Sequence, residues 1–119
     1  MADQYGHRPI IVGFGPAGMF AALALLDRGI RPLIFERGKR IEDRTFDVQR
    51  FIKDGVIDPE SNIQFGEGGA GSYSDGKLFS RVNNSEIVNK VLETYVKFGA
   101  PEEIVHIRNR TLAPTYCAK

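Results

Sequence analysis

The sequence predicts an α/β fold that starts with a β-α-β unit, and three segments near its beginning lead to this prediction. Residues 9–13, PIIVG, form a β-branched run that stops at glycine, as in a strand buried on both faces of a parallel sheet. Residues 16–27, PAGMFAALALLD, are rich in helix-forming Ala, Leu and Met and predict a buried helix. Residues 32–36, PLIFE, follow after a very short connection as the second strand of a right-handed unit.

A glycine pattern lies in the turn between the first strand and its helix. Gly13, Gly15 and Gly18 fit G-x-G-x-x-G, and Glu36 ends the second strand 23 residues after Gly13. These glycines permit, in order, a tight turn, the approach of a pyrophosphate and close helix–strand packing. The alternative is a β-α-β unit whose glycines serve packing alone. Because strand, helix and acidic residue are all in place, we expect a Rossmann-like dinucleotide-binding unit.

Glu36 narrows the choice of dinucleotide. A carboxylate at this position accepts hydrogen bonds from both hydroxyls of an adenosine ribose, and it repels a 2′-phosphate. The adenosine half is therefore expected to be that of FAD or NAD rather than NADP. The glycine pattern alone does not choose between FAD and NAD.

The residues after Glu36 depart from a plain Rossmann domain, which would continue with a third strand. Residues 36–55, ERGKRIEDRTFDVQRFIKDG, predict a partly helical stretch. Its inward side chains are expected to be apolar: Phe46, Val48, Phe51 and Ile52.

The glycine-rich segment, FGEGGAGSYSDG at residues 65–76, holds five of the chain's 13 glycines. Composition leaves two interpretations, a flexible linker or a backbone shaped to contact a ligand. A flat flavin ring needs the close backbone approach that Gly66, Gly68, Gly69 and Gly71 would allow. Successive N–H groups in such a turn also predict an anion-binding concavity.

Several of these motifs resemble one family. The stretch VGFGPAGMFAALALLDRGIRPLIFERG is similar to the FAD-binding start of the two-dinucleotide-binding-domain flavoproteins. Together with NIQFGEGGAGSYSDGKL and KFGAPEEI, it makes residues 9–107 resemble the N-terminal part of bacterial uncharacterised FAD-dependent dehydrogenases, also called NAD(P)/FAD-dependent oxidoreductases. The resemblance implies bound FAD, hydride transfer by the flavin, and NAD(P)H as an electron donor of the intact protein. It also favours a flavin-contacting segment over a linker.

The resemblance implies roles for individual positions. Five residues would hold the pyrophosphate: Gly13, Gly15, Pro16, Ala17 and Gly18. Glu36 would hold the ribose, Arg37 would lie along the adenosine, and Arg44 would pair with a phosphate. Five more would line the flavin: Gly68, Gly69, Ala70, Gly71 and Ser72. Lys77 would stabilise the anionic reduced ring; for Arg44 and Lys77 the alternative is a solvated surface charge. No residue is assigned as a catalytic acid or base, and no metal site is predicted.

The later part of the chain predicts a helix and then a break in the resemblance. Residues 84–99 form an amphipathic pattern ended by glycine, and Pro101 starts a short helical turn. The family continues with a segment similar to KPHIGTD and a far longer protein, whereas residues 108–119 read RNRTLAPTYCAK. Codons permitted for residues 109–119 also encode KPHIGTDVLRK in a neighbouring frame. We therefore interpret residues 1–119 as the N-terminal portion of a truncated FAD-binding domain, with 108–119 as an out-of-frame tail; an ordinary C-terminus is the alternative.

Composition restricts the partners. Sixteen Lys and Arg against fifteen Asp and Glu leave a net charge of +1, which is atypical of nucleic-acid-binding or membrane-binding surfaces. The single cysteine excludes an internal disulfide, and no apolar run reaches the roughly 20 residues that span a bilayer. We expect a cytoplasmic protein whose uncovered apolar faces lead to marginal stability, self-association or weak FAD binding, and we expect no turnover by this chain alone. Three readings stay open: the flavin-binding part of an oxidoreductase, a non-enzymatic FAD- or NAD-binding module, or a non-functional truncation product.

Overall fold

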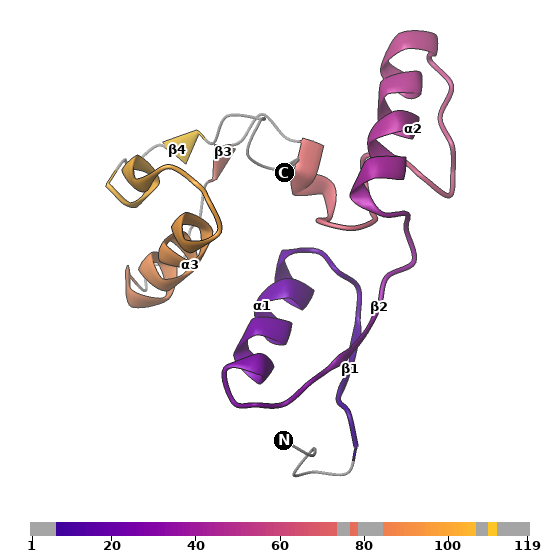
Figure 1. Cartoon of the computed structure of the whole chain (residues 1–119). Coiled ribbons are helices and arrows are strands. Elements are labelled where there is room, and N and C mark those ends of the chain that lie inside the picture. The colour runs from indigo at the N-terminus through magenta and orange to yellow at the C-terminus, as the bar shows by residue number, and fades with distance from the viewer. Residues whose placement is uncertain (1–6, 74–76, 79–84, 107–109, 112–119) are drawn as a thin grey trace. The chain divides into compact units, whose positions relative to one another are not determined.

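The computed structural model describes residues 7–73, 77–78, 85–106 and 110–111, and it divides the chain into two units, residues 1–72 and 73–119 (Figure 1). The first unit holds β1 (Ile10–Val12), α1 (Pro16–Leu26), β2 (Leu33–Phe35) and α2 (Ile41–Asp54). A short 3₁₀ helix, η1 (Ala70–Tyr73), follows at its end. The second unit holds β3 (Lys77–Leu78), α3 (Ser85–Lys97), a second 3₁₀ helix η2 (Glu102–Val105), and β4 (Arg110–Thr111).

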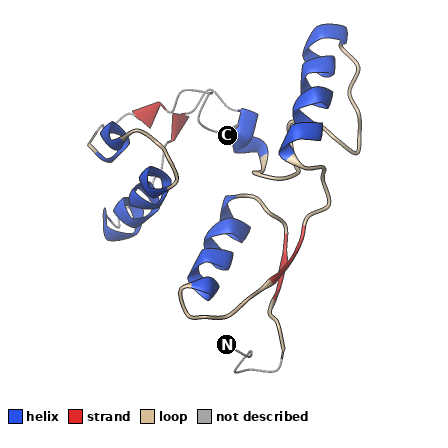
Figure 2. Cartoon of the chain, in the orientation of Figure 1, coloured by secondary structure: helices blue, strands red, loops and turns tan. Residues whose placement is uncertain are grey.

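The first unit confirms the predicted α/β class. Strands β1 and β2 are parallel, with Ile11 opposite Ile34, and α1 connects them (Figure 2). The pairing continues past the strand ends, because the N–H of Gly13 donates to the carbonyl of Phe35 at 2.7 Å. The resulting β-α-β unit places the end of β1 directly before the start of α1, where the glycine pattern lies.

Helix α1 packs closely on β1 because residue 18 has no side chain. A Cβ added to Gly18 would lie only 2.1 Å from the carbonyl oxygen of Gly13 and 3.4 Å from Cγ2 of Ile11. These distances show that the third glycine of the pattern performs the predicted packing role. Although the helix is apolar on all sides, only Ala22 is buried, so the prediction of a buried helix is wrong for most of its surface. The expectation of uncovered apolar faces is confirmed for this helix, where Leu26 is 50% exposed.

The strands are also less buried than predicted. Ile11 and Ile34 point to the α1 side and are half-buried, but the opposite face is exposed, with Val12 at 86% and Phe35 at 54%. Because successive side chains of a strand alternate between faces, Ile10 and Leu33 share this exposed apolar face. The expectation of strands buried on both faces is therefore wrong for this structure.

Helix α2 buries a polar face instead of the predicted apolar one. Its buried residues are Arg44, Asp47 and Val48, which share one side of the helix at a spacing of three and four. Of the four apolar residues expected to point inward, Val48 is buried and Phe51 is half-buried, while Phe46 and Ile52 are exposed. Gly55 ends the helix in the left-handed conformation, as a C-terminal glycine commonly does.

The second unit is organised around the contact between α3 and η2. Leu92 of α3 and Ile104 of η2 are buried together, surrounded by half-buried apolar neighbours: Val88, Tyr95, Val96, Ala100 and Val105. The helix predicted over residues 84–99 is confirmed as Ser85–Lys97, and the turn predicted after Pro101 is confirmed as η2. β3 pairs antiparallel with β4, which the sequence did not predict. Most of the tail interpreted as out of frame lies outside the described residues.

Among the helices that the structure describes, none is long and apolar enough to cross a membrane.

Candidate functional site

The candidate site starts at the fingerprint loop, residues 13–18, where β1 turns into α1. Gly13 has a φ of +95°, a conformation that suits glycine, and Gly15 is the N-cap residue of α1. No side chain caps this helix, and no acidic residue lies in its first turn. The first N–H groups of a helix lack intrahelical partners and carry the positive end of its dipole. The start of α1 is therefore suited to bind an anion such as a pyrophosphate.

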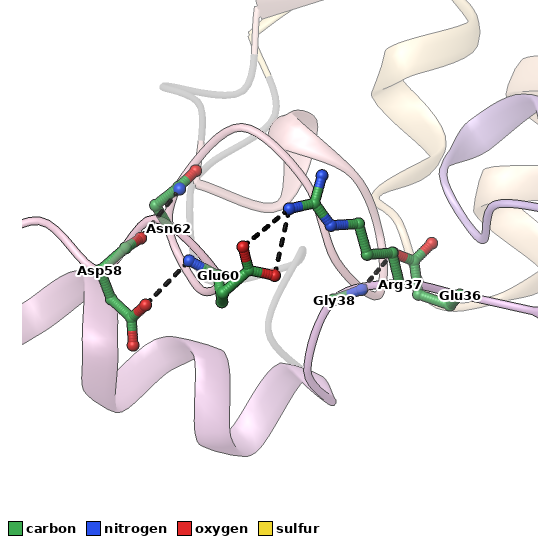
Figure 3. A network of polar contacts seen from close by, with 6 residues as sticks. All are labelled: Glu36, Arg37, Gly38, Asp58, Glu60 and Asn62. Atoms are coloured by element: carbon green, nitrogen blue, oxygen red, sulfur yellow. Dashed lines mark hydrogen bonds and ion pairs between the residues drawn. The ribbon is translucent and has the colours of Figure 1, made fainter.

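Glu36 connects the fingerprint loop with the end of β2. Its Oε2 accepts a hydrogen bond from the N–H of Phe14 at 2.6 Å. Its Oε1 accepts one from the N–H of Gly38 at 2.8 Å (Figure 3). Burial alone would raise the pKa of Glu36, but the bonds from Gly38 and Phe14, with the charge of Arg44, hold the pKa below its ordinary value. The residue is thus an ionised carboxylate, and each oxygen keeps acceptor capacity for a ribose hydroxyl.

The glycine-rich segment folds back onto the fingerprint loop. The N–H of Gly68 donates to the carbonyl of Phe14 at 2.9 Å. A Cβ added to Gly69 would lie 3.3 Å from Cα of Gly15 and 3.2 Å from Cδ of Pro16, so the two backbones are in contact there. A flexible linker would make no such contacts, and the linker interpretation is wrong for residues 66–69. Contact of these residues with a flavin stays a prediction.

The predicted anion-binding concavity is not formed by residues 67–69. Their N–H groups donate to carbonyls of the protein itself: those of Lys39, Phe14 and Gly66, respectively. The loop uses these groups because it packs against both the fingerprint loop and the chain before α2. The prediction is therefore wrong for this part of the segment, and the start of α1 is the better anion site.

Arg44 of α2 lies beneath the return loop, which we define as residues 62–69. The residue is 0% exposed, and its guanidinium donates to four carbonyl oxygens of this loop. Nε donates to Asn62 at 3.0 Å, Nη2 to Ile63 at 2.7 Å, and Nη1 to Glu67 at 2.8 Å and Gly69 at 2.7 Å. The alternative of a solvated surface charge is therefore wrong for Arg44, while its pairing with a phosphate stays a prediction.

Two further contacts hold α2 to the return loop and to the segment between β2 and α2. Oε2 of Glu67 accepts a hydrogen bond from the N–H of Ile41 at 2.8 Å, and a carboxylate is favourable at that helix start. Nζ of Lys39 lies 2.7 Å from Oδ2 of Asp47. The hydrogen bond from Lys39 holds the pKa of Asp47 below its ordinary value, and the same bond raises the pKa of Lys39.

Arg37 lies at the surface, beside Glu60, which precedes the return loop, and Phe65, which belongs to it. Its Nη2 contacts both carboxylate oxygens of Glu60, at 2.9 and 3.1 Å (Figure 3). Its guanidinium lies 4.8 Å from the centre of the Phe65 ring. Asp58 orients Glu60 by accepting a hydrogen bond from its N–H at 2.8 Å. The planar group of Arg37 is thus held open to solvent, and its expected place along an adenosine stays a prediction.

The remaining predicted residues are placed at the end of the glycine-rich segment. Ala70 and Gly71 are exposed in η1, and the side chain of Ser72 packs over Gly68, where an added Cβ would lie 2.0 Å from its Oγ. Lys77 lies in β3 of the second unit, so its role near the flavin stays a prediction. Among the described residues, no group of His, Cys, Asp or Glu side chains is arranged to hold a metal ion.

Two features of the site were missed by reasoning from the sequence. Gly38 lies directly against Gly66, because an added Cβ at Gly38 would meet Cα of Gly66 at 2.3 Å. Gly38 follows Glu36 and Arg37 and precedes a predicted helix. A glycine at such a position indicates that another segment of backbone can lie close to it. The contact of Glu67 with Ile41 joins residues 26 positions apart, and no local pattern announces it.

Comparison with known proteins links the chain to a longer relative but to no family. No family model matches the chain. The chain is similar to a protein of Clostridium beijerinckii that is described as an uncharacterized protein, with 53% identity over 102 residues. The match covers 86% of this chain and 19% of the relative, so the chain spans about a fifth of the relative's length.

Proposed function

We propose that the chain is the FAD-binding N-terminal part of a FAD-dependent oxidoreductase. The observation that carries the proposal is the contact between two glycine backbones, Gly15 and Gly69, at the uncapped start of α1. Because neither position carries a side chain, the return loop packs directly against the start of α1, where a Cβ on Gly69 would lie 3.3 Å from Cα of Gly15. An ionised carboxylate, Glu36, stands beside the same loop.

Each part of a dinucleotide has a suitable partner in this arrangement. The N–H groups at the start of α1, from Ala17 and Gly18 onward, would bind the pyrophosphate. Glu36 would accept hydrogen bonds from the ribose hydroxyls and would disfavour a 2′-phosphate. Bound FAD would supply the capacity to accept and release a hydride, while the protein supplies binding and orientation. Substrate and electron acceptor belong to the longer protein, for which we propose NAD(P)H as donor and the cytoplasm as location.

The test is a binding measurement with three dinucleotides. The purified chain is titrated with FAD, NAD and NADP, with flavin fluorescence and calorimetry as readouts and circular dichroism as the check of folding. We expect FAD to bind, NADP to bind far more weakly, and no donor oxidation by this chain alone. The full-length Clostridium beijerinckii protein is measured in parallel, and we expect it to carry flavin that NADH or NADPH bleaches. The proposal would be refuted if the chain and the relative are both folded and neither binds FAD.

The second candidate is a non-enzymatic module, which the same fold observation supports because NAD domains share the glycine pattern. An NAD-binding domain would bind NAD with little affinity for FAD. A flavin-binding module without enzymatic activity would hold FAD that no nicotinamide donor reduces, in the long relative as well as in this chain. The titration and the bleaching assay therefore separate the three outcomes.

A further inference from the structure

Arg44 gives an inference that goes beyond the roles suggested by the sequence. We propose that Arg44 is a positioning residue for the dinucleotide site: its buried guanidinium holds the return loop against the fingerprint loop before any ligand binds. The identity of the ligand in this inference rests on the proposed function. Its geometric basis is independent of that function: the guanidinium contacts four carbonyls, and Gly69 contacts Gly15.

The shape of the guanidinium suits this task. Arginine has five N–H donors in a rigid planar fork, and four of its bonds here end on carbonyls of Asn62, Ile63, Glu67 and Gly69. These carbonyls lie at both ends of the return loop, so one side chain closes the loop on itself. Gly66 completes the fit, because an added Cβ there would lie 2.8 Å from Cδ of Arg44.

The return loop transmits the effect of Arg44 to the fingerprint loop. Gly69 accepts a bond from Arg44 through its carbonyl, and it faces Gly15 and Pro16 so closely that an added Cβ would lie 3.3 Å from Cα of Gly15 and 3.2 Å from Cδ of Pro16. Gly68, one residue earlier, donates its N–H to the carbonyl of Phe14. A chain that lacked the guanidinium would have to order this loop at the moment of binding, and affinity falls when ordering accompanies binding.

The position of Arg44 argues against direct contact with the ligand. The side chain is fully buried and its donors point to main-chain carbonyls, so a phosphate would have to displace hydrogen bonds that the folded loop needs. The residue is therefore better suited to shape the site than to line it.

The experiment compares three variants of the full chain: Arg44→Met, Arg44→Lys and Val48→Ala. Val48 is the matched control, because it is buried on the same face of α2, one turn later, and is apolar. The first readout is hydrogen exchange of the amides of residues 62–69 without ligand. The second is the dissociation constant for FAD.

For Arg44→Met we expect faster exchange across the return loop, with α1 still protected, and FAD binding weaker by about tenfold or more. Arg44→Lys keeps the charge but offers three donors without the planar fork, so we expect partial rescue of both readouts. For Val48→Ala we expect faster exchange in α2 but an FAD affinity within about threefold of the native chain.

The outcomes separate the inference from the proposed function. If neither the native chain nor the Clostridium beijerinckii protein binds FAD, the proposed function fails, yet the exchange data on the chain still decide whether Arg44 holds the loop. Weaker FAD binding with unchanged loop protection would overturn the inference in favour of direct phosphate contact. Unchanged loop protection and affinity would overturn it as well. If Arg44→Met does not fold, Arg44→Lys carries the same comparison, and native protection with native affinity in that variant overturns the inference.

Discussion

The two helices of the first unit achieve burial by opposite means. Helix α1 is apolar on every side, yet only Ala22 is buried, because one side packs on β1 and the rest faces solvent. Helix α2 is largely polar, yet it buries Arg44 and Asp47 because the return loop and Lys39 supply their hydrogen-bond partners. Apolar residues become buried only where another element covers them. Charged groups of a polar helix can be buried by a single loop when that loop supplies their hydrogen-bond partners.

The difference extends to what holds the candidate site. In the part of the site formed by β1 and α1, the backbones of the helix and the strand lie close together. The lack of a side chain at Gly18 permits this short distance. The part from α2 and the return loop depends on hydrogen bonds to one guanidinium. The two parts meet at Gly15 and Gly69, so a loss in either should impair dinucleotide binding. Mutations can test each part separately.

The largest effect is expected for Gly18→Ala. An alanine in a helix normally adds about 1 kcal/mol of stability over glycine, but here the new Cβ would collide with the carbonyl of Gly13, whose backbone cannot easily move. We expect a loss of about 3 kcal/mol in the free energy of unfolding, measured by urea denaturation. Gly71→Ala is the control, since Gly71 has open space around it. Equal stability of the two variants would contradict the close packing of α1 on β1.

A smaller effect is expected for Glu36→Ala, which acts on both parts of the site. Removing the carboxylate leaves the N–H groups of Phe14 and Gly38 without their acceptor, at a cost of about 2 kcal/mol in unfolding free energy. FAD affinity should fall further than stability alone explains, because the ribose contact is lost too. Glu36→Gln keeps one acceptor oxygen and should lie between the native chain and the alanine variant in urea denaturation. A full loss in Glu36→Gln would show that charge, rather than hydrogen bonding, dominates.

Acid should weaken both parts of the site. A carboxyl whose pKa is lowered by folding binds its proton more weakly in the native chain than in the unfolded one. The stability contributed by Asp47 and Glu36 is therefore complete above the ordinary carboxyl pKa and is lost as the pH falls through the lowered values. Thermal melts between neutral and acid pH should show this decline. Asp47→Asn should make it shallower, and Asp43→Asn, exposed on the same helix, controls for the loss of one charge.

The sequence predicted the parts of the fold that depend on local patterns. The β-α-β unit, the helix after residue 84 and the roles of Gly13 and Gly18 follow from short-range features of strand, turn and helix. The buried face of α2 could not be predicted in this way. Phe46 and Ile52 have the right hydropathy for burial, but what becomes buried depends on where the return loop packs.

The same limit applies to the candidate site. The glycine-rich segment was expected near the fingerprint loop, and the contact of Gly69 with Gly15 agrees with that expectation. The use of its N–H groups could not be predicted, because Gly68 donates to Phe14, more than fifty positions earlier in the chain. Such pairings appear only when the three-dimensional path of the chain is known.

The smallest effect on stability is expected for substitution of Arg37. The contrast between exposed Arg37 and buried Arg44 tests whether burial decides how much a guanidinium stabilises the site. The side chains of Arg37 and Glu60 are 68% and 70% exposed, and exposed ion pairs contribute about 0–1 kcal/mol. Arg37→Met should therefore change the free energy of unfolding by less than about 1 kcal/mol, even with the Phe65 contact removed.

If Arg37 also lies along an adenosine, the same variant should weaken FAD binding several times more than Glu60→Gln, which removes the charge of its partner and leaves the guanidinium in place. Urea denaturation and FAD titration on both variants separate the two contributions. A stability loss in Arg37→Met as large as that in Arg44→Met would contradict the assignment of Arg37 to an exposed ion pair that adds little stability. It would mean that the exposed side of the site, like the buried side, depends on a guanidinium to hold its shape, because an exposed pair with a purely local role cannot have that effect.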